Sequence, residues 1–160
     1  MRRIEELLQA YGSSHTNRTN KVIHWVCVPL IFLSIVGLIW SIPNDFIAQF
    51  LSRNPNPFAN WATVLLVMVI AYYFSLSISL GIGMAIFSTL CLFIIKFIDE
   101  AAIAPVWQIS LGIFVIAWIG QFYGHKLEGA KPSFLKDLQF LLIGPAWLLH
   151  FIYKQLGIPY

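Results

Sequence analysis

Long stretches without charge are the feature of this chain that most restricts its fold. Residues 22–44 and residues 54–95 contain no Asp, Glu, Lys or Arg, which makes runs of 23 and 42 residues. A helix needs about 20 mainly apolar residues to cross a bilayer. Charged residues make up 11% of the chain, whereas soluble domains carry about a quarter. The charge distribution therefore predicts an all-α, polytopic integral membrane protein.

The lengths of the uncharged stretches predict four full spans and a short fifth segment. Residues 54–95 would form roughly 60 Å of helix, twice the thickness of a hydrocarbon core, so we expect a hairpin that turns at residues 79–83. The segment 138–153 contains Gly144-Pro145, which predicts a broken or re-entrant helix. The whole chain, 1–160, is expected to be one membrane domain, with a cytoplasmic segment at 1–20 and spans at 22–42, 58–79, 82–98 and 103–123.

The basic residues predict which ends of the spans face the cytoplasm. With a cytoplasmic N-terminus, seven of the ten basic residues lie inside, or eight if the last segment is re-entrant. This agrees with the positive-inside bias. The membrane is then the inner membrane in a bacterium or the endoplasmic reticulum in a eukaryote. Because the basic residues flank apolar segments, the net charge of +3 indicates contact with membrane lipids and no nucleic-acid partner.

Three of the four histidines gather at the cytoplasmic face in this topology. His15 and His24 flank the start of the first span, and His125 follows the fourth. Neutral imidazole is the commonest protein ligand for transition metals. The sequence therefore predicts a mononuclear metal site at this face, with His150 as a fourth candidate ligand whose position depends on the course of the last segment.

The spacing of the first two histidines sets a condition on this site. Nine residues correspond to about 900° of helical rotation, so His15 and His24 would point to opposite faces of a continuous helix. They converge only if residues 13–20 form a loop and the helix starts near Thr19 or Asn20. Two alternatives stay open, namely that His15 is a solvated loop residue and that His24 only binds a backbone carbonyl.

A second group of polar residues surrounds His125. Gln121 lies in an apolar helix end, where an amide without a partner costs roughly 1–3 kcal/mol. Glu128 follows His125 by three residues, so both can share a helical face. The structural alternative is a polar exit from the membrane with aromatic residues at headgroup level.

The residues in these two groups resemble a known motif. The patterns His15-x-Asn17-x-x-Asn20-x-x-x-His24-x-x-x-x-Pro29, Gln121-Phe122-x-Gly124-His125 and Gly144-Pro145 are similar to those of the small membrane 2-hydroxy fatty acid dioxygenases. The similarity covers nearly the whole chain. It implies an Fe(2+)-dependent enzyme that uses O2 to shorten 2-hydroxy fatty acids by one carbon.

The resemblance also suggests roles for individual residues. His15, His24 and His125 match the motif histidines, whereas His150 has no counterpart and is a metal-ligand candidate on its chemistry alone. Glu128 is the candidate catalytic residue, although the family pattern places its acidic residue one position later. On chemistry rather than on the resemblance, the candidate substrate-binding residues are Arg18, Asn20, Lys21, Gln121 and Lys126, of which the three basic residues could hold the substrate carboxylate.

The chemistry of the substrate agrees with such a site. A 2-hydroxy acid can chelate iron through its carboxylate and hydroxyl oxygens, and it supplies its own reducing equivalents. The chain contains no Walker motif and no Gly-x-Gly-x-x-Gly pattern for a nucleotide cofactor. Two other classes stay open: a haem- or quinone-binding membrane protein, and a non-catalytic membrane scaffold.

The predicted topology can be tested by labelling single cysteines in a background without Cys27 and Cys91. We expect His15→Cys and Lys126→Cys to react with an impermeant thiol reagent from the same side of the membrane, and Arg53→Cys from the other. Labelling of positions 15 and 126 from opposite sides would overturn the topology.

Overall fold

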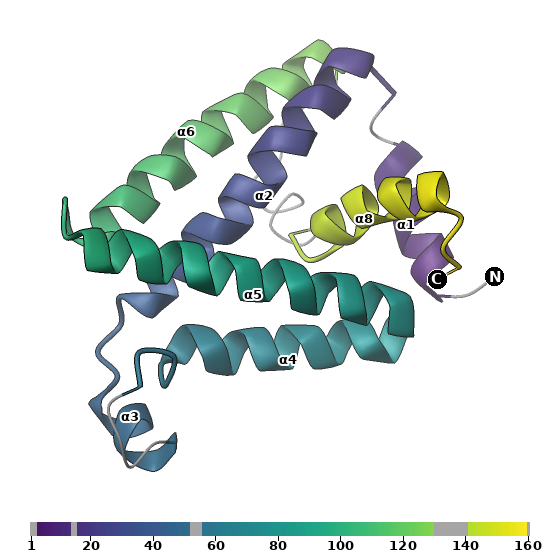
Figure 1. Cartoon of the computed structure of the whole chain (residues 1–160). Coiled ribbons are helices and arrows are strands. Elements are labelled where there is room, and N and C mark those ends of the chain that lie inside the picture. The colour runs from purple at the N-terminus through teal and green to yellow at the C-terminus, as the bar shows by residue number, and fades with distance from the viewer. Residues whose placement is uncertain (1–2, 14–15, 52–55, 130–140, 160) are drawn as a thin grey trace.

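Helices form all the regular secondary structure that the computed structural model describes, which covers residues 3–13, 16–51, 56–129 and 141–159. No strand occurs in these ranges, so the expectation of an all-α fold is confirmed there. Figure 1 shows the arrangement of the helices. They are α1 (Arg3–Ser13), α2 (Arg18–Trp40), α3 (Asp45–Leu51), α4 (Trp61–Leu76), α5 (Ile78–Ala101), α6 (Val106–Leu127) and α8 (Ile143–Leu156).

Three of the described helices are long and apolar enough to cross a membrane, namely α2, α5 and α6. Helix α4 is equally apolar but has only 16 residues, about 24 Å of helix against a hydrocarbon core of about 30 Å. The structure therefore supports a membrane protein with three candidate spans, and the expected four full spans are not confirmed.

The long uncharged stretch does fold into a hairpin, but its turn lies before the expected position. Helices α4 and α5 pack side by side, and Ser77 alone connects them with an extended backbone. The glycines that suggested a turn at residues 79–83 lie inside α5. A Cβ on Gly81 would lie 2.5 Å from the ring of Phe74. This glycine therefore allows the two arms of the hairpin to approach closely.

The last apolar segment also differs from the expectation. Helix α8 is continuous over Ile143–Leu156, and Gly144-Pro145 lies in its first turn. Proline is tolerated there because the first N–H groups of a helix have no partner within it. The expected break in the middle of 138–153 is thus absent, while residues 138–140 lie outside the described part. The hydroxyl of Tyr153 donates to the carbonyl of Ser79 at 2.6 Å and ties α8 to α5.

The N-terminal segment contains a helix that was not expected. In α1 the buried residues Ile4, Leu8 and Tyr11 follow the spacing of one helical face. This face packs against α8, where the rings of Tyr11 and Trp147 lie 5.3 Å apart between centroids. The predicted cytoplasmic segment 1–20 therefore includes a helix that is part of the folded core.

Small residues bring α2 and α6 close together as an antiparallel pair (Figure 1). A Cβ on Gly37 of α2 would lie 2.1 Å from the hydroxyl oxygen of Ser110 on α6. At the other end of the pair, a Cβ on Gly124 would lie 2.3 Å from the side-chain oxygen of Asn20. Small residues are typical of helix contacts within membranes. This packing places the start of α2 beside the end of α6.

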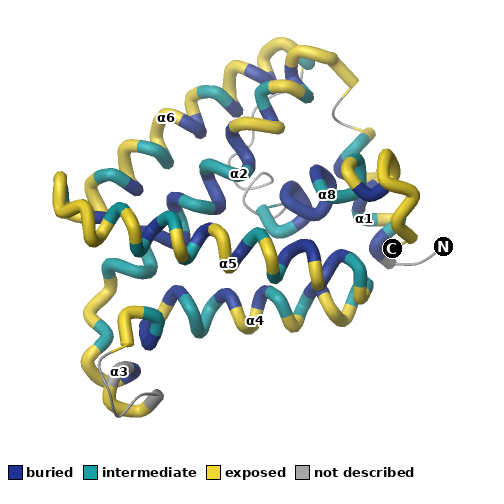
Figure 2. The backbone as a smooth tube through the Cα atoms, in the orientation of Figure 1, coloured by how far each residue is buried: buried dark blue, intermediate teal, exposed yellow. Residues whose placement is uncertain are grey.

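The distribution of side chains suits a lipid environment, as the burial pattern in Figure 2 illustrates. Large apolar side chains remain exposed along α5, including Ile86 and Phe97 at 67% and 72% exposure. Polar side chains are instead among the most buried of the described residues: Asn20, His24, Ser34, Asn60, Ser88, Ser110, Gln121 and His125. Because polar groups inside a membrane protein are costly, those at the α2–α6 contact are candidates for function.

The packing of α2 on α6 can be tested with one glycine and a control. Gly37→Ala should destabilise the protein by about 1–3 kcal/mol, the usual cost of overpacking, because its methyl group would overlap with Ser110 and Ile95. Gly112→Ala on α6 is the control, since a Cβ there meets no atom within 4 Å among the described residues. Thermal unfolding of the detergent-solubilised protein gives the unfolding midpoints of both variants. Equal midpoints for the two variants would contradict this packing.

Candidate functional site

Two histidines from distant parts of the sequence meet between α2 and α6. The ring centroids of His24 and His125 lie 5.2 Å apart, with an angle of 86° between the ring planes. Both side chains are buried, at 1% and 7% exposure. His24 lies in the second turn of α2 and His125 in the last turn of α6. The antiparallel packing of these helices thus brings two of the four predicted metal ligands together.

A backbone contact fixes the orientation of His24. Its Nδ1 lies 2.9 Å from the carbonyl oxygen of Asn20, one turn earlier in α2. A carbonyl oxygen only accepts hydrogen bonds, so Nδ1 carries the proton in this contact. Histidines that bind metals usually have such a second contact. The sequence left open that His24 only binds a backbone carbonyl. This contact is present, and a histidine that coordinates a metal would need it as well.

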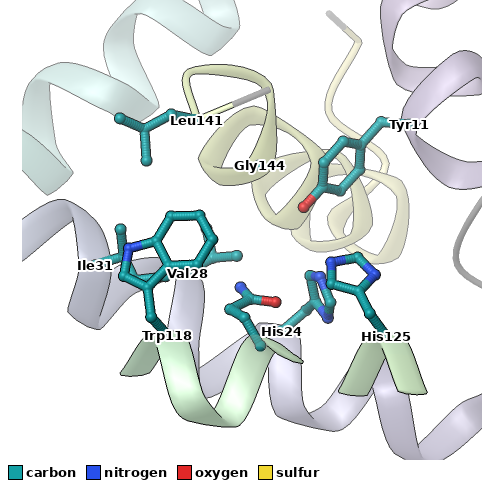
Figure 3. A pocket seen from close by; sticks show the side chains of 9 residues that line it. Tyr11, His24, Val28, Ile31, Trp118, His125, Leu141 and Gly144 are labelled. Carbon is teal, nitrogen blue, oxygen red and sulfur yellow. The ribbon is translucent and has the colours of Figure 1, made fainter. Parts of the chain in front are cut away.

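The two histidines line a cavity of about 20 Å³, which is about the space that one water molecule requires. Figure 3 shows Tyr11, Trp118 and the two histidines around the same space. Within the described residues the side-chain oxygen of Gln121 is buried without a hydrogen-bond partner. Leaving such an acceptor unpaired costs roughly 1–3 kcal/mol. The described residues that line this histidine cavity are Tyr11, His24, Val28, Ile31, Trp118, Gln121, His125, Leu141 and Gly144.

The donor atoms of the histidine cavity fit a transition metal such as iron. Imidazole nitrogens suit iron, and the amide oxygen of Gln121 is a further acceptor without a partner among the described residues. The described residues contain no group of three or more His, Cys, Asp or Glu side chains that could hold a metal ion. They therefore supply two imidazoles, and His15, the third predicted ligand, lies outside the described residues.

His150, the fourth candidate ligand, does not line the histidine cavity. It is half-buried on α8, where its ring lies 5.3 Å from that of Phe151. Burial lowers the pKa of the imidazole, and the nearby charge of Lys154 lowers this pKa further. The structure does not place His150 with His24 and His125 around the histidine cavity.

Glu128 connects the end of α6 to the segment that precedes α2. Its carboxylate accepts hydrogen bonds from the backbone N–H of Asn17, at 2.9 and 3.0 Å, and from the backbone N–H and hydroxyl of Thr16. The side-chain amide of Asn20 donates to the same carboxylate at 2.8 Å. We call this set of contacts the Glu128 clasp. It holds residues 16–20 against α6, directly before the turn that carries His24.

The clasp determines the protonation state of Glu128. Burial alone would raise the pKa of this carboxyl group, but the donors of Thr16, Asn20 and Asn17 outweigh it and lower the pKa from 4.5 to about 2. The group is therefore ionised at neutral pH and accepts hydrogen bonds only. These contacts give Glu128 a positioning role, and its predicted catalytic role stays a prediction.

The asparagines of the motif have structural roles that their spacing in the sequence did not reveal. Helix α2 begins at Arg18, directly before the expected start near Thr19, and its N-cap is Asn17 rather than Thr19 or Asn20. The side-chain oxygen of Asn17 accepts from the N–H groups of Thr19 and Asn20 at 2.9 and 3.3 Å. Asn20 itself is fully buried, in space that Gly124 leaves open.

The predicted substrate-binding residues fall into two sets. Asn20 and Gln121 are buried near the histidines. Arg18 and Lys126 are exposed and Lys21 is half-buried. All three basic residues lie in the first turn of α2 or the last turn of α6, so they surround the end of the helix pair that carries His24 and His125. Their contact with a substrate stays a prediction.

Tyr11 is a residue of the histidine cavity that the sequence analysis missed. Its ring lies 6.4 Å from that of His24 between centroids. A Cβ on Gly144 would lie 3.4 Å from its hydroxyl oxygen, which places this oxygen beside the start of α8. The spacing of Ile4, Leu8 and Tyr11 is the signal that indicates a helical face in this segment.

One comparison with known proteins identifies a family. A family model described as "2-hydroxy-palmitic acid dioxygenase Mpo1-like" matches residues 1–156 of the chain. This match confirms the resemblance inferred from the motif residues. No curated protein and no solved structure matches the chain.

The pKa of Glu128 predicts how the clasp responds to acid. Because the folded-state pKa is lowered to about 2 from 4.5, the ionised carboxylate stabilises the fold fully above about pH 4.5, and this contribution disappears as the pH falls toward 2. We expect Glu128→Gln to have a lower unfolding midpoint than the parent protein at pH 7, and the difference to shrink below pH 4.5.

The matched control is Glu100→Gln, which removes an exposed carboxylate that pairs with Lys96 on the same helix. Exposed pairs of this kind contribute little, so this variant should unfold close to the parent at both pH values. A Glu128→Gln variant as stable as Glu100→Gln at pH 7 would contradict the clasp.

Proposed function

The chain belongs to the 2-hydroxy-palmitic acid dioxygenase Mpo1-like family, and from this premise we propose that it removes C1 of a 2-hydroxy fatty acid in an Fe(2+)-dependent reaction with O2. The observation that supports the proposal most directly is the meeting of His24 and His125 in one buried cavity. Their end of the α2–α6 pair lies at the cytoplasmic face in the proposed topology.

The proposed ligands are His24, His125 and, from outside the described residues, His15. Bound Fe(2+) supplies the redox chemistry with O2 and an attachment point for the two oxygens of a 2-hydroxy acid. The bond from Nδ1 of His24 to the carbonyl of Asn20 keeps Nε2 as the coordinating nitrogen. Burial of both rings keeps bulk water away from the reacting groups.

The proposed reaction balances without a further reductant. A 2-hydroxy acid and one O2 give the acid one carbon shorter, carbon dioxide and water. The bond between C1 and C2 breaks, C2 is oxidised from the alcohol to the carboxylate level, and C1 leaves as carbon dioxide. The substrate thus provides the four electrons that reduce O2. This agrees with the lack of a nucleotide-binding motif in the sequence.

The remaining polar residues bind and orient the substrate in this proposal. The side-chain oxygen of Gln121, which has no partner among the described residues, accepts a hydrogen bond from the substrate hydroxyl. Lys21 lies three residues before His24, and Lys126 directly follows His125. Their positive charges attract the carboxylate of the fatty acid to the histidine cavity. Glu128 holds residues 16–20 against α6 and thereby positions the start of α2, which carries Lys21 and His24.

Replacing the histidines one at a time tests the metal site. His24→Ala and His125→Ala should each lose most of the bound iron and nearly all turnover, because each removes one of the few metal ligands. His150→Ala is the control on α8, and since His150 does not line the histidine cavity it should keep its iron. Metal analysis of anaerobically purified protein gives the iron content. Full iron in the His24→Ala and His125→Ala double variant would place the metal elsewhere.

The choice of substrate tests the chemistry separately. The iron-loaded protein should consume O2 with 2-hydroxypalmitate and form the fatty acid one carbon shorter. Palmitate lacks the second chelating oxygen and should react at least tenfold more slowly. Mass spectrometry measures how much shortened fatty acid forms from each of the two substrates. Equal turnover of both acids, or turnover that persists after iron is removed, is incompatible with the proposal.

A further inference from the structure

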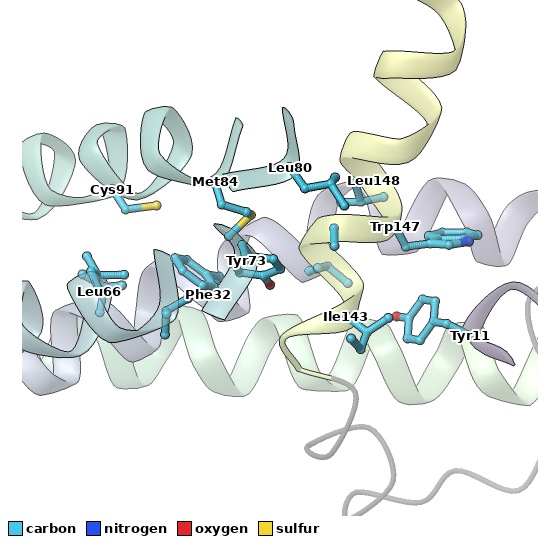
Figure 4. Packing of buried hydrophobic residues seen from close by; sticks show 14 of the residues in the cluster. Tyr11, Phe32, Leu66, Tyr73, Leu80, Met84, Cys91, Ile143, Trp147 and Leu148 are labelled. Carbon is cyan, nitrogen blue, oxygen red and sulfur yellow. The ribbon is translucent and has the colours of Figure 1, made fainter. Parts of the chain in front are cut away.

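A second cavity lies between α2, α5 and α8, with a volume of about 170 Å³ and an almost wholly apolar lining. We call it the apolar cavity. Its inner wall includes Met84 and Leu148, which are 0% and 6% exposed, and Figure 4 shows both in the packing between α5 and α8. Its rim includes Trp25 and Ile152, which are 41% and 36% exposed. The cavity therefore runs from the protein core to an exposed apolar part of the surface.

The apolar cavity adjoins the histidine cavity along two helices. On α2, His24 and Val28 line the histidine cavity, and their neighbours Trp25 and Pro29 line the apolar cavity. On α8, Gly144 lines the histidine cavity and its neighbour Pro145 lines the apolar cavity. Consecutive residues of a helix point about 100° apart. The two cavities therefore lie on adjacent sides of the same helices.

Val28 of α2 contacts α8 between the two cavities. A Cβ on Gly144 would lie 3.1 Å from Cγ1 of Val28, so α8 rests directly on this side chain. Val28 is 7% exposed. Val28 and Gly144 therefore lie in contact at the place where the linings of the two cavities meet.

The size and depth of the apolar cavity suit a hydrocarbon chain. An apolar cavity of about 150 Å³ can hold one benzene molecule, so 170 Å³ corresponds to a segment of about six carbons. Residues 25–29 of α2 follow His24 by up to five positions, which is within about 8 Å along the helix axis. A fatty acid whose head lies at His24 thus has its first carbons at the level of this cavity.

We propose that the apolar cavity binds the proximal part of the acyl chain of the 2-hydroxy fatty acid, and that Val28 and Gly144 lie at the boundary between this chain and its head beside His24 and His125. This inference rests on the proposed function for the identity of the occupant. Its direct consequence is that side chains of α8 which touch neither histidine determine how well the substrate binds.

Photo-crosslinking of the full-length protein in lipid nanodiscs tests the location. The probe is 2-hydroxypalmitate with a diazirine in the proximal part of its acyl chain, added without O2 so that it is not consumed. We expect saturable labelling of peptides that contain residues 84–87 and 145–152, and loss of this labelling with excess unlabelled 2-hydroxypalmitate. Labelling that only added phospholipid removes would assign the cavity to membrane lipid and overturn the proposal.

Two substitutions on α8 provide a matched pair. Leu149→Phe fills the apolar cavity and should weaken specific labelling about tenfold, whereas Leu156→Phe lies outside it, at 67% exposure, and should have no effect. Ile152→Phe at the exposed rim is a second filling variant that leaves the core intact. Circular dichroism confirms that each variant is folded. Unchanged labelling in both filling variants would overturn the proposal.

The failure of this inference can be told apart from the failure of the proposed function. If the one-carbon-shorter product forms while the probe labels other helices, the acyl chain binds elsewhere and the enzyme assignment stands. If the two cavity peptides are labelled and 2-hydroxypalmitate competes, but no product forms with iron and O2, the apolar cavity is an acyl site and the proposed reaction is wrong.

Discussion

The contact between α2 and α6 is the constraint on which the rest of this structure depends. Within a bilayer, apolar side chains gain little by leaving lipid for a neighbouring helix, so helix association relies on close packing and on polar contacts. Both occur here, because Gly37 lies against Ser110 and Gly124 makes room for Asn20. This antiparallel pair brings His24 and His125 together, although they lie on helices far apart in the sequence.

Several residues of the recognised motif have a part in the architecture of the site. Asn17 caps α2, and Asn20 fills the space beside Gly124 and donates to Glu128. These contacts align the first turn of α2 with the last turn of α6. The spacing of the motif thus reflects helix capping and packing as well as metal chemistry.

The separation of polar and apolar cavities matches the two ends of an amphiphile. The histidine cavity carries imidazoles and an amide oxygen, and basic residues surround it at the helix ends. The apolar cavity opens toward an exposed apolar surface on the other side of Val28 and Gly144. Helix α2 lines both cavities, together with α6 at the histidine cavity and α5 at the apolar cavity. Helices α1 and α8 complete the walls, since they contribute Tyr11, Gly144 and Leu148.

The sequence by itself determined the helical class and the apolar stretches long enough to span, because length, charge and residue type are local properties that can be read along the chain. It also predicted that His24 and His125 gather at one face, whereas their contact depends on the packing of α2 against α6. Only the tertiary structure decided the single-residue turn at Ser77, the unbroken start of α8 at Gly144-Pro145, and the place of Tyr11 beside His24. Each of these depends on contacts between segments distant in sequence. A glycine or proline looks the same in the sequence whether it ends a helix or allows a neighbour to approach, and the packing partner alone distinguishes the two.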